Sequence, residues 1–210
     1  MSRLTLASRL GAITALLLVA SAAEAAPVLD QVHDSNLNGA SVVYQYRDTT
    51  QGFTVGIDGY LTQVDISVGR YVDTTADLIL DIRPTVAGVP VEDDLLALIT
   101  VSIPASEIPL VADFITVDLG AGIEVVTGTL LSLTLQSSGP IRGEGFLWEA
   151  TVSGDPYLDG QRLYRSPYGP TTWSWIGGDQ AFRTYVVPEP STALLLAFGL
   201  MALAAGRRRR

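Results

Sequence analysis

The stretch Gln63-Val64-Asp65-Ile66-Ser67-Val68 decides the fold of this chain. Valine and isoleucine occupy every second position, and polar residues occupy the positions between them. Because successive side chains of a β-strand point to opposite faces, the alternation predicts a strand with one face in a core and the other toward water.

The same period of two recurs along the chain and predicts further strands over residues 78–83, 114–119 and 131–136. Residues typical of turns separate them, at Asp58-Gly59, Arg83-Pro84, Ala87-Gly88, Gly120-Ala121-Gly122, Ser138-Gly139-Pro140 and Gly177-Gly178. Only two short segments, 93–98 and 105–108, have a helical character, and prolines 104 and 109 confine the second to one turn. We expect an all-β chain that folds as an antiparallel, jelly-roll-like β-sandwich.

A family resemblance covers most of region 41–187. The motifs that carry it are Gln51-Gly52-Phe53-Thr54-Val55-Gly56, Gly59-Tyr60-Leu61-Thr62 with Val64-Asp65, and a closing part from Trp173 to Val186. They resemble surface β-sandwich domains known as choice-of-anchor domains. The resemblance implies a fold and an extracellular setting, and it brings no activity with it.

Composition narrows the class of protein. Between Pro27 and Val187 there are 15 Asp and 5 Glu against 7 Arg, and the chain contains no lysine. Such an acidic domain repels phosphate backbones, so we expect no nucleic-acid partner. Cysteine is absent, which excludes disulfides, thiol catalysis and thiolate metal sites. The mean hydropathy of +0.32 is positive because both ends of the chain are apolar, so it does not indicate a polytopic membrane protein.

The amino terminus, residues 1–25, has the pattern of a secretory signal peptide. Arg3 and Arg9 precede an apolar run over residues 10–20, and Ala23 and Ala25 form an A-x-A cleavage site. The alternative is an uncleaved membrane helix, for which the run is short. We expect cleavage after Ala25, a lead-in segment over 26–40 and the sandwich over 41–187.

The carboxyl terminus, residues 188–210, combines three features. Pro188, Glu189 and Pro190 form an extended stretch with few hydrogen-bond donors, an uncharged apolar segment follows, and arginines close the chain. The anchor residues are Leu194, Leu195, Leu196, Phe198, Leu200, Leu203, Arg207, Arg208, Arg209 and Arg210. The 16 residues from 191 to 206 make a helix of about 24 Å, which is short for a permanent membrane span. The alternative reading of the prolines is a rigid spacer.

Together these features resemble the PEP-CTERM sorting signal of exosortase substrates in Gram-negative bacteria. The resemblance covers about a ninth of the chain. It implies export, transient anchoring in the inner membrane, and processing by an exosortase-like enzyme. It also implies a final location at the cell surface or in an exopolysaccharide matrix.

Two candidate binding sites come from the residues alone. Asp34, Asn36 and Asn38 fit the first half of a calcium-binding loop. The twelfth position of that loop, where a bidentate Glu is needed, is Gln45, and an Asx-rich turn would explain the same residues. Aromatic residues gather late in the chain beside charged ones, as a sugar-binding surface requires, although they could equally form core. The candidate sugar contacts are Tyr157, Tyr164, Tyr168, Trp173, Trp175 and Asp179.

An enzyme is the competing class of protein. Glu144 and Glu149 could serve glycoside hydrolysis, but nothing fixes them at a catalytic spacing. His33 is the only histidine, so a Ser-His-Asp arrangement would depend on it alone. We therefore expect a structural or carbohydrate-adhesive protein rather than a glycan hydrolase. We expect no cofactor, and a calcium ion at the Asp34 loop is the alternative.

Overall fold

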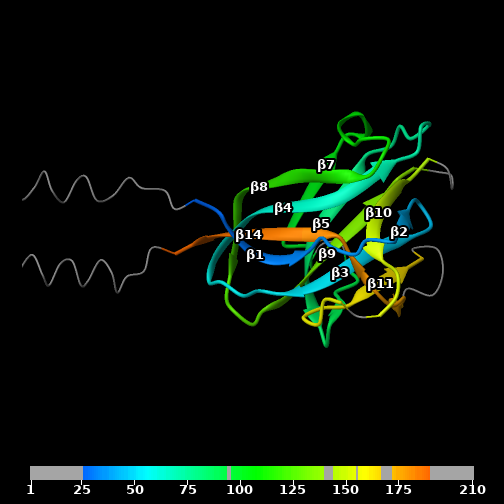
Figure 1. The fold of residues 1–210 in the computed structure, drawn as a ribbon. Helices are drawn as coiled ribbons and strands as arrows, with labels where there is room; N and C mark the ends of the chain where they lie inside the picture. The colour runs from blue at the N-terminus through cyan, green and yellow to red at the C-terminus, as the bar shows by residue number, and fades with distance from the viewer. Residues whose placement is uncertain (1–25, 94–95, 140–143, 155, 167–171, 190–210) are drawn as a thin grey trace, which may run out of the picture.

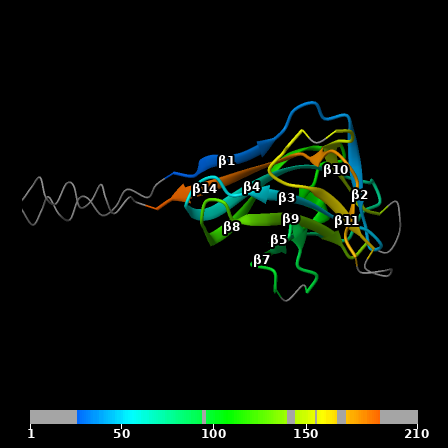
Figure 2. The same cartoon turned by 90° about the horizontal axis from the view of Figure 1, so that it is seen from below.

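The computed structural model describes residues 26–93, 96–139, 144–154, 156–166 and 172–189. Its strands form two antiparallel sheets packed face to face, which confirms the predicted β-sandwich. Figures 1 and 2 show the two sheets from directions that differ by 90°. The predicted signal peptide and the predicted carboxyl-terminal helix lie outside the described residues.

The first sheet contains strands from the beginning, the middle and the end of the described chain. Its strands are β1 (Val28–His33), β2 (Gly39–Val43), β4 (Gly59–Arg70), β8 (Asp113–Val125), β10 (Phe146–Thr151), β13 (Asp179–Gln180) and β14 (Phe182–Pro188). β14 lies between β1 and β4, and β8 pairs with the other edge of β4. β10 continues the sheet beyond the start of β14, where it pairs with β2, β4 and β13.

The second sheet contains β3 (Asp48–Thr54), β5 (Leu78–Val86), β6 (Val89–Pro90), β7 (Ile99–Ile103), β9 (Leu130–Ser137), β11 (Arg162–Arg165) and β12 (Ser174–Trp175). Its central order is β3-β9-β5-β7, with β11 and β12 added outside β3. Opposite it, the first sheet has the order β1-β14-β4-β8. Within these seven-stranded sheets, the four-strand orders β1-β14-β4-β8 and β3-β9-β5-β7, with the first strand beside the last, form the jelly-roll arrangement, as predicted.

The apolar positions of the predicted strands form the core. Val64, Ile66 and Val68 of β4 are fully buried, as are Leu80 and Ile82 of β5. Burying each such side chain stabilises the fold by about 1.5–3 kcal/mol. The one-turn element predicted near Pro104 is a 3₁₀ helix, η2 (Ala105–Glu107).

The predicted lead-in over residues 26–40 is wrong. Val28–His33 is strand β1, which pairs with β14 from Val28↔Val186 to His33↔Phe182, and β2 begins at Gly39. The sequence hides this strand because Val28, Leu29 and Val32 do not alternate with polar residues and remain 42–46 % exposed. What makes the segment a strand is its partner, which lies about 150 residues further along the chain.

A second correction concerns the polar positions of the alternating strands, which the sequence places toward water. The polar residues Asp65, Ser67, Asp81, Arg83, Ser132 and Thr134 are buried. On the second sheet these polar residues are buried because another segment of the chain covers them. Arg83 Nη1 donates to the carbonyl of Val91 at 3.2 Å, and Arg165 Nη1 donates to the carbonyl of Glu92 at 3.1 Å. The chain at Val91–Glu92 therefore lies over the outer face of this sheet.

Candidate functional site

The two chain ends of the sandwich lie side by side, and the sorting-motif residues begin there. β14 runs antiparallel to β4 as far as Pro188, which pairs with Gly59 (Figure 1). A Cβ on Gly59 would lie 2.2 Å from the carbonyl oxygen of Val187, and this residue has a φ of +149°. Only glycine fits there, so the glycine of the predicted Asp58-Gly59 turn allows the end of β14 to pair closely with β4.

Pro188 is half-buried on the sheet, and Glu189 is exposed directly after it. Pro190, all the predicted anchor residues from Leu194 to Arg210, and the signal-peptidase positions Ala23 and Ala25 lie outside the described residues. Within the described residues, no helix is long and apolar enough to cross a membrane.

The candidate sugar contacts do not form one surface. Tyr157 and Asp179 are 7 % and 0 % exposed, so the prediction that they contact a glycan is wrong. Tyr157 donates its hydroxyl proton to Gln31 at 2.8 Å and meets the Phe182 ring edge-on at 5.2 Å. Burial raises the pKa of the Tyr157 phenol well above its usual value.

Trp175 is the exposed member of the group. It is 64 % exposed on the edge strand β12, and its partner in β11 is Leu163. Trp173 is half-buried, with the Arg165 guanidinium 5.0 Å from its ring centre. Because Leu163 and Arg165 share a face of β11, the two tryptophans lie on the same outer face of the second sheet, as their spacing predicts.

Tyr164 belongs to the opposite face of β11, beneath the Arg47 guanidinium at 4.7 Å. Arg47 is a neighbour that the sequence did not indicate, because it lies more than a hundred residues earlier in the chain. Tyr168 lies outside the described residues. The exposed aromatic surface is therefore smaller than predicted and centres on Trp175.

Asp179 is instead part of a buried polar cluster that links the two sheets, formed by Ser41, Gln51, Arg162, Asp179 and Gln180. Gln51 donates its amide to Asp179 at 3.0 Å and accepts from the backbone N–H of Gln180 at 2.8 Å. Arg162 donates to Ser41 at 2.8 Å and to the Gly177 carbonyl at 3.0 Å. The Gln180 amide lies 2.6 Å from the Ser41 hydroxyl.

Desolvation inside this cluster lowers the pKa of Arg162 to about 10, and the nearby Arg47 adds to the shift. The guanidinium therefore stays charged at neutral pH. The alternating pattern contains one indication of the cluster. Gln51 lies on the same face of β3 as Phe53, so a polar side chain occupies a position that faces the core. Its partners cannot be identified without the fold.

The calcium-loop residues have protein partners in the structure. Asp34 Oδ2 accepts from Arg183 at 2.9 and 3.0 Å, and Asn38 Oδ1 accepts from the backbone N–H of Val152 at 2.9 Å. Asn36 has a left-handed φ of 58°, and its carbonyl accepts from Thr151. No group of three or more His, Cys, Asp or Glu among the described residues could hold a metal ion, and calcium binding here stays a prediction.

The residues considered for catalysis are separated from one another. His33 is buried in β1, not in a lead-in, and its Nε2 lies 3.1 Å from the Thr151 hydroxyl. Glu149 accepts from Ser67 Oγ, while Glu144 lies in the approach to β10. Among the described residues, no hydrogen bond or ion pair joins His33, Glu144 and Glu149 into a nucleophile and base.

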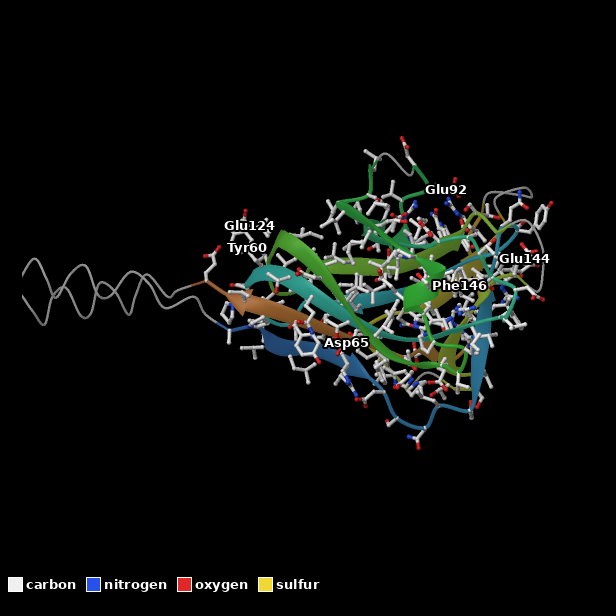
Figure 3. The ribbon with its side chains drawn as sticks, turned by 90° about the horizontal axis from the view of Figure 1, so that it is seen from above. Tyr60, Asp65, Glu92, Glu124, Glu144 and Phe146 are labelled. Atoms are coloured by element: carbon white, nitrogen blue, oxygen red, sulfur yellow. The ribbon has the colours of Figure 1, made fainter. Side chains whose placement is uncertain are left out.

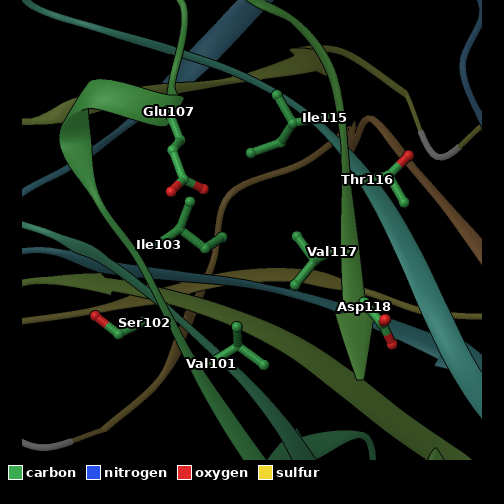
Figure 4. A pocket seen from close by; sticks show the side chains of 8 residues that line it. All are labelled: Val101, Ser102, Ile103, Glu107, Ile115, Thr116, Val117 and Asp118. Carbon is green, nitrogen blue, oxygen red and sulfur yellow. The ribbon is translucent and has the colours of Figure 1, made fainter. Parts of the chain in front are cut away.

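A cleft of about 210 Å³ opens between β7 and β8, at the edge where the two sheets meet. Figure 4 shows the Glu107 carboxylate pointing toward Ile103, across from Ile115 and Val117. Asp118 lies at the end of the cleft, and its Oδ1 accepts from the backbone N–H of Gly120. Ligand pockets usually take about 300–1,000 Å³, so this cleft is small for a glycan.

Comparison with known proteins places one feature of the chain in a family. The family model of the PEP-CTERM protein-sorting motif matches residues 186–210. No curated protein matches the chain. The match begins at Val186, so the resemblance of region 41–187 to choice-of-anchor domains stays a prediction. The chain carries the PEP-CTERM protein-sorting motif, which begins in the last strand of the sandwich and implies export and sorting by an exosortase.

Proposed function

We propose that the sandwich is a structural and adhesive protein of the cell surface or exopolysaccharide matrix, delivered there by exosortase processing of the motif. The adhesive surface in this proposal is the β11–β12 edge of the second sheet, with Trp175 as its main contact. The observation that supports it is the 64 % exposure of the Trp175 side chain, the largest among the exposed aromatic residues described.

The local geometry suits stacking on a sugar ring. The indole lies beside Gly177, where a Cβ would be in ordinary van der Waals contact with Trp175 Cη2 at 3.4 Å. Sugar C–H groups stack on such a ring, and hydroxyl groups need polar partners beside it. Arg165 lies on the same face, but it is buried and engaged by Asp48 at 2.9 Å and by the Glu92 carbonyl, so the polar partners of a sugar would come from other exposed groups of this edge.

Retention of the fragment 26–187 on immobilised polysaccharides tests the proposal. Trp175→Ala should weaken retention by about tenfold, because it removes the stacking surface. Tyr60→Ala is a matched control, since Tyr60 is 42 % exposed in the first sheet, next to the end of β14. Retention on no glycan, or equal loss in both variants, would contradict the adhesive role.

A glycan-active enzyme is the competing function. Release of reducing sugar by the same fragment would overturn the preference for a binding protein, provided that one carboxylate substitution abolishes it. Glu107→Gln and Asp118→Asn in the cleft, and Glu149→Gln on β10, are the substitutions to use. A structural role without adhesion predicts neither retention nor release.

A further inference from the structure

The sorting motif is fixed to one end of the sandwich, which we call the base. The base consists of Val28, Asp58, Tyr60, Glu124, Val126 and Glu189. Val28 pairs with Val186, and Tyr60 pairs with both Val187 and Glu124. Figure 3 shows Tyr60 and Glu124 at the end of the molecule where β14 terminates.

The linker between the base and the predicted anchor is very short. Pro188 is held in the sheet by its pairing with Gly59, and the apolar segment begins at Ser191. Three residues span at most about 10 Å when fully extended. An enzyme that grips the motif at the membrane surface must therefore come within reach of the base.

The side chains of the base suit a protein partner. Val28, Tyr60 and Val126 are 46 %, 42 % and 58 % exposed, so apolar area is available there. Glu124, Asp58 and Glu189 are also exposed and acidic. Asp58 accepts from the backbone N–H of Thr127 at 2.6 Å, which lowers its pKa and keeps it charged.

The charge of the base decides between two occupants. Its three carboxylates have no cationic neighbour within the base, and the chain contains no lysine. Anionic lipid headgroups would be repelled by this surface, whereas a basic protein surface would be attracted. The base combines exposed apolar and charged side chains, as protein interfaces do.

We propose that the base docks onto a basic and apolar surface of the membrane enzyme that processes the motif. Cleavage would then depend on the folded sandwich as well as on residues 188–190. The proposal rests on the exosortase route and is independent of glycan binding.

The test follows removal of the tail from the full-length chain in an exporting host, by pulse-chase and intact mass. Glu124→Arg/Val126→Arg should slow trimming by about tenfold, because it reverses the charge of the docking surface. Glu124→Gln, a milder change at an exposed side chain, should slow it by a smaller factor. Glu92→Arg is the matched control: Glu92 is exposed, and Figure 3 shows it away from Glu124.

An eight-residue Gly-Ser insertion between Val187 and Pro188 separates docking from folding. The longer linker lets the enzyme reach the motif without contacting the base, so Glu124→Arg/Val126→Arg should no longer slow trimming. Parental rates in the arginine variant, or equal slowing with and without the insertion, would overturn the docking proposal. A parent chain that keeps its tail would overturn the processing route itself, and the docking proposal with it.

Discussion

The interior of the sandwich contains two regions that hold the sheets together by different means. In one region, side chains such as Phe53 and Phe182 pack across the interface, with ring centres 6.1 Å apart. In the other, Gln51 and Arg162 of the second sheet make hydrogen bonds to Asp179 and Ser41 of the first. Apolar contacts tolerate sliding, whereas hydrogen bonds fix positions.

The polar region includes two of the short strands of the sandwich. β13 has two residues and β11 has four, so few backbone hydrogen bonds hold them in register. Side-chain hydrogen bonds from Gln51 and Arg162 supply the missing positional restraint. The difference indicates that apolar packing stabilises this fold, while the buried polar cluster sets the placement of its irregular edge.

The largest expected effect comes from breaking the polar region with Asp179→Ala. The substitution removes the acceptor of Gln51 Nε2 and of the backbone N–H of Tyr157, both in buried surroundings. We expect a loss of about 4 kcal/mol in the free energy of unfolding, because buried polar groups lose their partner. Urea unfolding of the 26–187 fragment measures it, and a loss below about 1 kcal/mol would contradict the assigned role.

Leu133→Ala breaks the apolar region. Leu133 is fully buried at the centre of β9, between β3 and β5. The cavity and the lost transfer free energy should cost about 3 kcal/mol. The same urea titration applies, and the register of β11 should be unaffected, as judged by amide exchange at Leu163 and Tyr164.

A volume-conserving pair sharpens the comparison. Leu133→Met should cost less than about 1.5 kcal/mol, because the core keeps its volume. Gln51→Met also keeps the volume but removes hydrogen bonds to Asp179 and Gln180, and should cost about 2 kcal/mol. Equal costs would mean that both regions act only through packing.

The smallest expected effect is a pH dependence from His33, the only histidine. Burial lowers its pKa from 6.5, although Asp179 and Asp34 offset part of the shift. The unfolded chain therefore binds the proton more readily, and the stability contribution of neutral His33 is lost as the pH falls below about 6.5. His33→Gln should reduce the difference between the free energies of unfolding at pH 7.5 and pH 5.5. An unchanged difference would mean that other groups cause the pH dependence.

The sequence predicts the apolar region well and the polar region poorly. Val64, Ile66 and Leu80 are in the core because the period of two determines which face is buried. Gln51 and Arg162 carry no such signal, since a polar residue in a strand looks the same whether water or a second sheet covers it. Strand β1 is hard to predict for a related reason, because its pairing with β14 is a long-range contact.

The candidate sites follow the same rule. Tyr157 and Trp175 look alike in the sequence, yet one is buried against Phe182 and the other is exposed. The sorting motif was predictable because its function depends on local order along the chain: two prolines, an apolar segment and arginines. Its attachment to the sheet through Gly59 required the structure.

The intact mass of the mature protein, recovered from the exporting host, tests the central claim most directly. Removal of the signal peptide and of the tail predicts a chain that begins at Ala26 and lacks Arg207–Arg210. A protein found in the cytosol with the mass of the full 210 residues would contradict the account.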